Sequence, residues 1–225
     1  IGDIASFSFQ ESKNLSAGEG GILTTSSREW WERCWTVHNT GRVPGGAWYQ
    51  HEYLGSNYRM TEWQAAILLG QLKRLPAQME RRETNAAILY GMLGEIEGIE
   101  LFPLNPGIRH AWHLFMFRLE SGLARKIGKR NFAAALSAEG IPTEAGYVNL
   151  AGQKLFQSEL VRRRLSRPVD YAALPLPATD RACSVTLWFA QNLLLGDEAD
   201  LADIATGVRK VVENAGELEK LTISG

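Results

Sequence analysis

The chain has 225 residues, of which 45% are hydrophobic and 22% are charged, and these fractions are typical of a soluble globular protein. Its formal net charge of −1 gives no reason to expect nucleic acid or an anionic membrane as a partner. Two cysteines, Cys34 and Cys183, are too few for a disulfide framework, and no apolar run is long enough to span a bilayer, so we expect a cytoplasmic protein.

The first predicted elements are two strands joined by a loop that holds Lys13. The strands are expected over Ile4–Phe9 and Gly21–Thr25, and Ser27 is placed to cap a helix that reaches Trp35. A glycine-rich, aromatic segment follows over residues 38–56. A segment of this length without periodicity is more often functional than idle.

The start of the chain indicates that a piece is missing. Position 1 carries no methionine, and an apolar strand begins at once. A sheet made only of the two N-terminal strands would have unpaired edges and little cover. We therefore expect that the chain lacks an N-terminal segment of a larger domain.

A helix is expected from Thr61, where a capping pattern precedes an apolar run. Pro76 should kink this helix or restart it as a second helix that ends near Ile96. Further along, the pattern predicts strands over Ile99–Phe102, Trp112–Leu119, Pro142–Val148 and Ser184–Ala190, and helices over Lys129–Glu139 and Glu198–Asn214.

This alternation of strands and helices predicts an α/β fold with three parts. Residues 1–60 would be the remaining part of a large domain. Residues 61–98 would form connecting helices, and residues 99–225 a small C-terminal α/β domain.

Lys13 is the residue that is best suited to covalent chemistry. A lysine that forms a Schiff base must lose its proton, and it should sit on a rigid element beside an anion site. Ser8 offers a hydroxyl for a phosphate, and the glycines at 18, 20 and 21 let the backbone turn sharply. The run Gly-Glu-Gly-Gly is no P-loop, because the trailing Lys-Ser/Thr is missing. From spacing alone, a surface lysine in a Ser/Gly-rich hairpin loop remains the alternative.

Five segments resemble signatures of the DegT/DnrJ/StrS family of sugar aminotransferases, and together they cover nearly the whole chain. The segments are Ser6-Phe7-Ser8-Phe9-x-x-x-Lys13-Asn14-Leu15-x-x-Gly18-Glu19-Gly20-Gly21, His38-Asn39-x-Gly41-Arg42, Gly55–Ala66 followed by Gln71-Leu72, Gly146–Leu150, and Leu194–Asp197. The resemblance implies the C-terminal portion of a pyridoxal-phosphate-dependent transferase of the aspartate aminotransferase fold type, with the end of the large domain and the small domain.

The resemblance also implies roles for three cofactor residues. Lys13 would form the Schiff base with pyridoxal 5′-phosphate and act as the catalytic acid and base, and Ser8 would bind the phosphate. Asn57 would reach the phosphate of the neighbouring subunit, so the active sites of a homodimer would be shared. The partners of the pyridinium nitrogen and of the pyridine ring would lie before Ile1, so this chain alone should not run the full reaction.

Four further residues are substrate candidates, each with a plain structural alternative. Gln10 stands where many family members have histidine. Arg59 lies inside a signature but could form an ion pair at a helix start. His113 matches a family position near the substrate but could be a packed strand histidine, and Tyr147 lies in the expected substrate loop. No cluster has metal-ligand spacing, so no metal is expected.

The leading hypothesis is an aminotransferase that moves an amino group from glutamate or glutamine to a keto-sugar nucleotide or a keto-cyclitol, in antibiotic or surface-polysaccharide sugar biosynthesis. The retained lysine argues against the dehydrase relatives. Two alternatives are a lyase or aromatising member that resembles aminohydroxybenzoate synthases, and a non-catalytic regulator that binds a sugar nucleotide.

Overall fold

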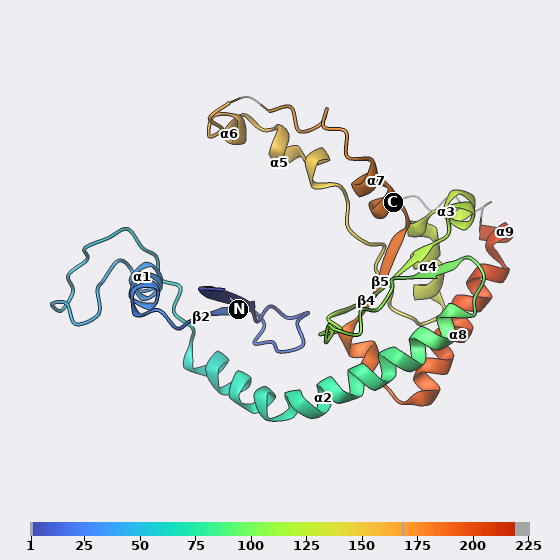
Figure 1. Cartoon of the computed structure of the whole chain (residues 1–225), viewed down its shortest axis with the longest axis horizontal. Helices are drawn as coiled ribbons and strands as arrows, with labels where there is room; N and C mark the ends of the chain where they lie inside the picture. The colour runs from blue at the N-terminus through green and yellow to red at the C-terminus, as the bar shows by residue number, and fades with distance from the viewer. Residues whose placement is uncertain (1, 168, 219–225) are drawn as a thin grey trace. The chain divides into compact units, whose positions relative to one another are not determined.

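The computed structural model describes residues 2–167 and 169–218. The chain divides into two compact units, Ile1–Glu80 and Arg81–Gly225, which are called here the N-terminal unit and the C-terminal unit. The boundary falls within one long helix (Figure 1).

The N-terminal unit begins with an antiparallel hairpin. Strand β1 (Ile4–Ser8) pairs with strand β2 (Gly21–Thr25), so that Ile4 lies opposite Thr25 and Ser8 opposite Gly21. Helix α1 (Arg28–His38) follows, and the Ser27 hydroxyl accepts a hydrogen bond from the backbone N–H of Trp30. The predicted strands and cap are therefore confirmed, and the helix runs past Trp35 to His38.

Helix α2 spans Glu62–Gly94 without interruption, with Pro76 inside it (Figure 1). Thr61 and Gln64 form the expected reciprocal cap, because each side chain accepts from the other residue's backbone N–H, at 3.3 and 3.1 Å. The expectation that Pro76 restarts the chain as a second helix is wrong, and no break separates the two parts. Proline removes one helical hydrogen bond, and the helix continues through this loss from Glu62 to Gly94.

The C-terminal unit is built on a three-stranded antiparallel sheet in the order β3-β4-β5. Its strands are β3 (Ile99–Leu101), β4 (Leu114–Leu119) and β5 (Thr186–Ala190). Helix α4 (Lys129–Ala138) packs against β5 and against α8 (Glu198–Glu213) (Figure 1). The predicted apolar face of α8 is buried as expected: Leu201, Ile204, Ala205, Val208 and Val211.

The remaining helices of the C-terminal unit are short. They are α3 (Ser121–Ile127), η1 (Leu150–Gly152), α5 (Lys154–Gln157), α6 (Glu159–Arg162), α7 (Pro177–Val185), η2 (Gln191–Leu195) and α9 (Ala215–Leu218).

Two strand predictions in this unit need correction. Residues 142–148 form only an isolated bridge between Glu144 and Trp188. The pairing ends there because Gly146 adopts a φ of +74°, and a side chain at that position would overlap the carbonyl oxygen of Thr186. Ser184 belongs to α7, which Pro177 starts as its first residue, so the strand begins only at Thr186.

The two units together form a mixed α/β structure, as predicted. No helix in the described part of the chain combines the length and apolar character needed to cross a bilayer.

Candidate active site

Lys13 lies in a loop that closes directly above the hairpin. At the base of the loop, the Phe9 N–H donates to the Gly20 carbonyl and the Ala17 N–H donates to the Phe9 carbonyl, both at 2.9 Å. The Phe9 side chain is buried and anchors this closure. Residues 10–19, which are called here the lysine loop, therefore leave and re-enter the sheet at fixed points.

The residues just before Lys13 form a tight local turn. The Ser8 hydroxyl accepts from the Gln10 N–H at 3.3 Å, and the Lys13 N–H donates to the Gln10 carbonyl at 3.0 Å. The side-chain oxygen of Gln10 accepts from both the backbone N–H and the hydroxyl of Ser12, at 3.0 and 2.6 Å. The oxygen end of this amide serves the turn, and its Nε2 is the end that can meet a substrate.

Three side chains of α2 hold the far side of the lysine loop. Gln71 makes two bonds with the backbone of Ser16: its Oε1 accepts from the N–H at 3.1 Å, and its Nε2 donates to the carbonyl at 2.6 Å. Gln64 donates from Nε2 to the Glu19 carbonyl at 2.8 Å.

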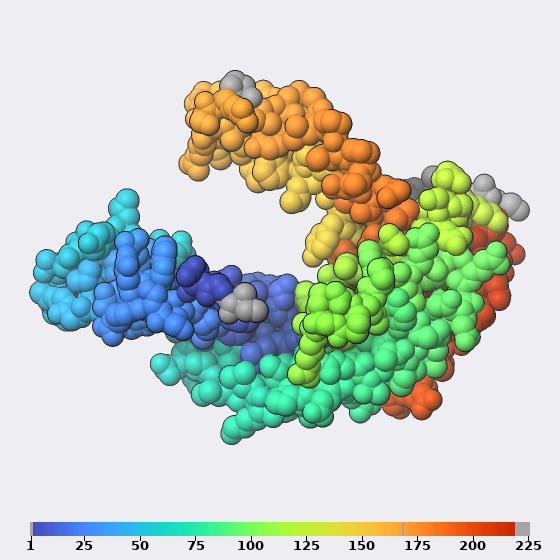
Figure 2. Space-filling model, viewed as in Figure 1, coloured from blue at the N-terminus to red at the C-terminus, as the bar shows by residue number. Residues whose placement is uncertain are grey.

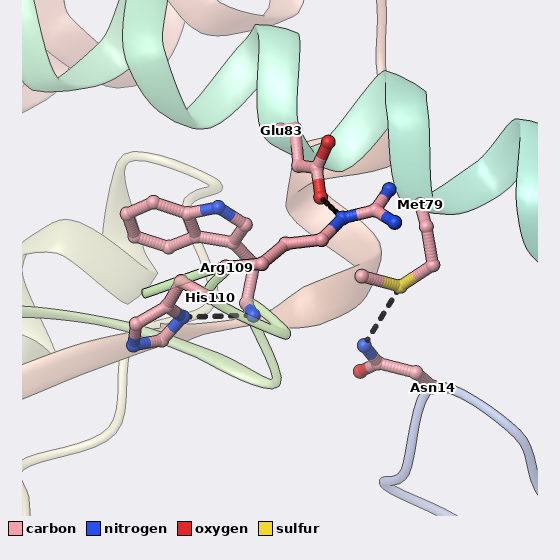
Figure 3. Close-up of polar contacts among 6 residues, drawn as sticks. Asn14, Met79, Glu83, Arg109 and His110 are labelled. Atoms are coloured by element: carbon pink, nitrogen blue, oxygen red, sulfur yellow. Dashed lines mark hydrogen bonds and ion pairs between the residues drawn. The ribbon is translucent and has the colours of Figure 1, made fainter. Parts of the chain in front are cut away.

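The third side chain of α2 that holds the lysine loop is Met79, and its partner Asn14 is the residue directly after Lys13. The amide of Asn14 donates to the sulfur of Met79 at 3.4 Å, and Figure 3 shows the two side chains facing each other. The loop that carries Lys13 is therefore attached to α2 at three places along its length.

The predicted cofactor residue Asn57 lies in a second segment of the N-terminal unit. It forms a bridge with Asn39, directly after α1, and its Oδ1 accepts from the Arg59 N–H at 3.3 Å. Arg59 donates from Nη1 to the side chain of the buried Asn39 at 2.7 Å. Asn57 and Arg59 are therefore brought together by one buried asparagine.

The segment between α1 and α2 folds back around Gly41. Thr40 and Gly41 both have positive φ, at 62° and 81°. The Gly41 carbonyl accepts from the N–H groups of Glu52 and Tyr53, at 2.8 and 3.1 Å, and a side chain on Gly41 would overlap the Tyr53 carbonyl oxygen. This close approach explains why the His-Asn-x-Gly-Arg pattern carries glycine there.

The same segment exposes large aromatic and aliphatic side chains. In the space-filling view, residues of α1 and the following segment, coloured blue to cyan, gather into one mass (Figure 2). Trp48 and Leu54 are 91% and 97% exposed, and Tyr58 is 70% exposed. A surface this apolar is typical of residues that contact another chain or a further part of the same chain.

The candidates His113 and Tyr147 belong to the C-terminal unit. His113 is half-buried and lies directly before β4. Tyr147 is exposed, with its ring centroid 4.4 Å from that of Trp188, and its carbonyl accepts from the ammonium group of Lys129 at 3.0 Å. Burial lowers the pKa of Lys129.

A small cavity of about 370 Å³ opens beside the segment that precedes β4. Glu83 of α2 pairs with Arg109 on its wall, and this hydrogen bond lowers the pKa of the Glu83 carboxyl (Figure 3). The rings of His110 and Trp112 lie 4.3 Å apart in the same wall. Sequence reasoning did not identify the Glu83–Arg109 pair, because these two residues lie 26 positions apart in segments without a shared pattern.

The residues of the N-terminal unit suit an aldehyde cofactor with a phosphate. A primary amine at Lys13 can bond to a carbonyl carbon, and a hydroxyl at Ser8 can donate to a phosphate oxygen. Ser8 is the last residue of β1, and Lys13 lies in the loop that follows, which hydrogen bonds fix at its base. Within the described ranges there is no group of three His, Cys, Asp or Glu side chains that could hold a metal ion.

Comparison with known proteins gives consistent matches along the chain. The model of the DegT/DnrJ/EryC1/StrS aminotransferase family matches residues 1–205. The L-glutamine:2-deoxy-scyllo-inosose aminotransferase of Streptoalloteichus tenebrarius is 32% identical over 235 residues, which cover 97% of this chain and 55% of that protein.

Two solved structures are also similar. The crystal structure of 3-amino-5-hydroxybenzoic acid synthase has a TM-score of 0.81 and 28% identity, over 94% of this chain and 54% of that one. S. venezuelae DesV, solved in complex with a ketimine intermediate, has a TM-score of 0.71 and 28% identity, over 93% of this chain and 52% of that one. The chain thus spans about half the length of the relatives that it matches.

Proposed function

The chain belongs to the DegT/DnrJ/EryC1/StrS aminotransferase family, and from this premise we propose that it carries the reactive lysine of a pyridoxal-phosphate-dependent aminotransferase. The aminotransferases of this family depend on pyridoxal phosphate, so the predicted family, fold type and cofactor are confirmed. The roles of individual residues, the substrates and the assembly are the content of the proposal.

The position of Lys13 is the observation that carries the proposal. The lysine follows a strand end, its loop is closed at the base by two backbone hydrogen bonds, and α2 holds the loop from the other side. A catalytic group must be held within a fraction of an ångström of its working geometry. A lysine in an ordinary surface loop has no need for such support.

In this proposal, pyridoxal phosphate supplies an electron sink for the carbanion that forms at the reacting carbon. Lys13 Nζ would bond to the carbonyl carbon of the cofactor with loss of water. After the amine of the donor replaces it at that carbon, the freed Lys13 amine would move a proton between the carbons of cofactor and substrate. Ser8 Oγ donates to a phosphate oxygen. The Oδ1 of Asn57 is oriented by the Arg59 N–H, which leaves Nδ2 as the atom that donates to the phosphate of the partner subunit's site.

We assign glutamine or glutamate as the amino donor and a keto-cyclitol or keto-sugar as the acceptor. The support is the similarity to an L-glutamine:2-deoxy-scyllo-inosose aminotransferase. Gln10 Nε2, Arg59, His113 and Tyr147 are the proposed substrate contacts. A homodimer is proposed because the segment around Asn57 exposes large apolar side chains, and the cytoplasm is proposed because both cysteines are unpaired thiols.

The proposal is tested on the product of the entire open reading frame, incubated with pyridoxal phosphate and reduced with borohydride. Peptide mass spectrometry should find the reduced cofactor attached to Lys13. Lys13→Ala should lose the label and the transfer activity, whereas Lys73→Ala, at an exposed position of α2, should keep both. Label on a different lysine, or full activity of Lys13→Ala, would refute the assignment.

A second function is favoured by the similarity to 3-amino-5-hydroxybenzoic acid synthase, the solved structure with a TM-score of 0.81. An aromatising lyase would convert a hydroxylated six-membered amino-ketone ring into an aromatic product by elimination of water, without consuming glutamine. An ultraviolet-absorbing product formed in the absence of an amino donor would favour this alternative. Transfer of 15N from glutamine to a keto-cyclitol would favour the aminotransferase.

A further inference from the structure

Gln71 makes the most specific contact between α2 and the lysine loop. Its carboxamide lies against the peptide of Ser16 and satisfies both the N–H and the carbonyl, as a neighbouring β-strand would. Both bonds are part-buried, at 3.1 and 2.6 Å. A glutamine is the natural side chain for this task, because one planar group supplies both a donor and an acceptor.

Gln64 makes a second amide contact with the loop, two helical turns earlier. Its Nε2 donates to the Glu19 carbonyl at 2.8 Å, while its Oε1 accepts from the N–H and the hydroxyl of Thr61 at the helix start. Residues seven positions apart lie on the same face of a helix. One face of α2 therefore presents two amides to the same loop.

Besides these two amides, the contact of Asn14 with Met79 and the bonds at the base of the loop hold it in place. The bonds at Phe9, Ala17 and Gly20 close its base. Ser16 is three residues from Lys13, so a shift of the Ser16 peptide is passed along a short, tightly turned backbone to the lysine. This geometry gives Gln71 influence over Lys13 through the backbone of the loop.

We propose that Gln71, assisted by Gln64, is a positioning residue that sets the placement of Lys13 for its reaction with the cofactor carbonyl. This inference rests on the proposed function of Lys13. It assigns a physical reason to the glutamines of the Thr-Glu-x-Gln-Ala-Ala and Gln-Leu segments. The two glutamines act through the backbone of the lysine loop.

The decisive variant is Gln71→Glu in the product of the entire open reading frame. Glutamate keeps the length of the side chain and one acceptor oxygen, but it replaces the donating Nε2 with an oxygen that faces the Ser16 carbonyl. Gln78→Glu is the matched control. It makes the same change of charge on the same helix, and Gln78 makes no hydrogen bond through its side chain among the residues that the structure describes.

Two measurements are made on each variant: hydrogen exchange of the amides of residues 14–19, and the rate at which Lys13 is labelled by pyridoxal phosphate and a hydride reductant. Gln71→Glu should speed the exchange and slow the labelling, each by about tenfold, the change produced by losing about one buried hydrogen bond. The control should match the wild type in both measurements. Circular dichroism and thermal unfolding establish that each variant is folded.

The outcomes separate the inference from the function on which it rests. If wild-type Lys13 is not labelled, the proposed function fails. If wild-type Lys13 is labelled and Gln71→Glu is labelled at the same rate, the proposed function stands and the positioning role is overturned, whether or not the loop exchanges faster. If Gln71→Glu does not fold, Gln71→Met, which keeps the volume and removes both polar groups, is put through the same two measurements.

Discussion

A substitution at Gly41 should open the segment that presents Asn57, and a second glycine provides the control. Gly41 and Gly45 have nearly the same backbone conformation, with φ of +81° and +76°. A side chain on Gly41 would overlap the Tyr53 carbonyl oxygen, whereas a side chain on Gly45 would meet nothing within 4 Å. The two alanine variants therefore share the cost of the left-handed conformation and differ in the clash.

The size of each effect follows from these contacts. The left-handed conformation costs an alanine about 1–2 kcal/mol, so Gly45→Ala should destabilise its segment by about that amount. Relief of the clash at Gly41 requires the Tyr53 peptide to move, which breaks the bonds from Glu52 and Tyr53 to the Gly41 carbonyl. At about 1 kcal/mol for each bond, the cost of Gly41→Ala rises to about 3–4 kcal/mol.

Native-state hydrogen exchange of the Glu52 and Tyr53 amides measures the free energy of opening this segment. Gly41→Ala should lower it by about 2 kcal/mol more than Gly45→Ala does. In the proposed homodimer, where Asn57 would reach the phosphate of the neighbouring subunit's cofactor, Gly41→Ala should also weaken the retention of pyridoxal phosphate. If Gly41→Ala and Gly45→Ala lower the free energy of opening equally, the close approach between Gly41 and the Tyr53 carbonyl does not contribute to the stability of the segment.

Two further predictions concern the C-terminal unit. Asp197 caps α8 and forms a reciprocal capping box with Asp200. Asp197→Ala should therefore lower the free energy of unfolding by about 1 kcal/mol, as measured by thermal unfolding. Asp203→Ala, at an exposed position of the same helix, is the control, and equal losses in the two variants would contradict the cap assignment. The hydrogen bond from Arg109 lowers the pKa of Glu83, so this pair should stabilise the segment before β4 above the unfolded pKa of Glu83, and the contribution should be lost as the pH falls through the lower folded value. If an NMR titration gives Glu83 the same pKa in the wild type and in the Arg109→Ala variant, the pair does not contribute in this way.

The elements with strong local signals could be predicted from the sequence. Ser27 and the Thr61–Gln64 pair are capping patterns, and the structure places helix starts at both. The apolar face of α8 follows the helical repeat and is buried. Pro76 does not end the helix as the local rule for proline suggests, because the loss of one backbone hydrogen bond is small beside the many that remain in a helix of 33 residues.

The residues of the candidate site could be predicted only where they belong to a recognisable sequence motif. The segment containing Lys13 and Ser8 was found by its signature, and the structure gives it a fixed loop. Gln71 was part of a quoted signature, yet its bond to Ser16 joins residues 55 positions apart, and no local pattern encodes such a contact. The seven-residue spacing between Gln64 and Gln71 was the one available hint.

The hairpin beneath the lysine loop has a consequence for how cofactor affinity should be understood. Its two strands expose Phe7, Ile22 and Leu23 by about half of their surface, and a two-stranded sheet is marginally stable without cover. Any surface that packs on these residues stabilises the strand end that leads into the lysine loop. Binding of the cofactor and covering of the hairpin are therefore thermodynamically linked, and the apparent dissociation constant for pyridoxal phosphate should depend on protein concentration whenever that cover comes from another chain.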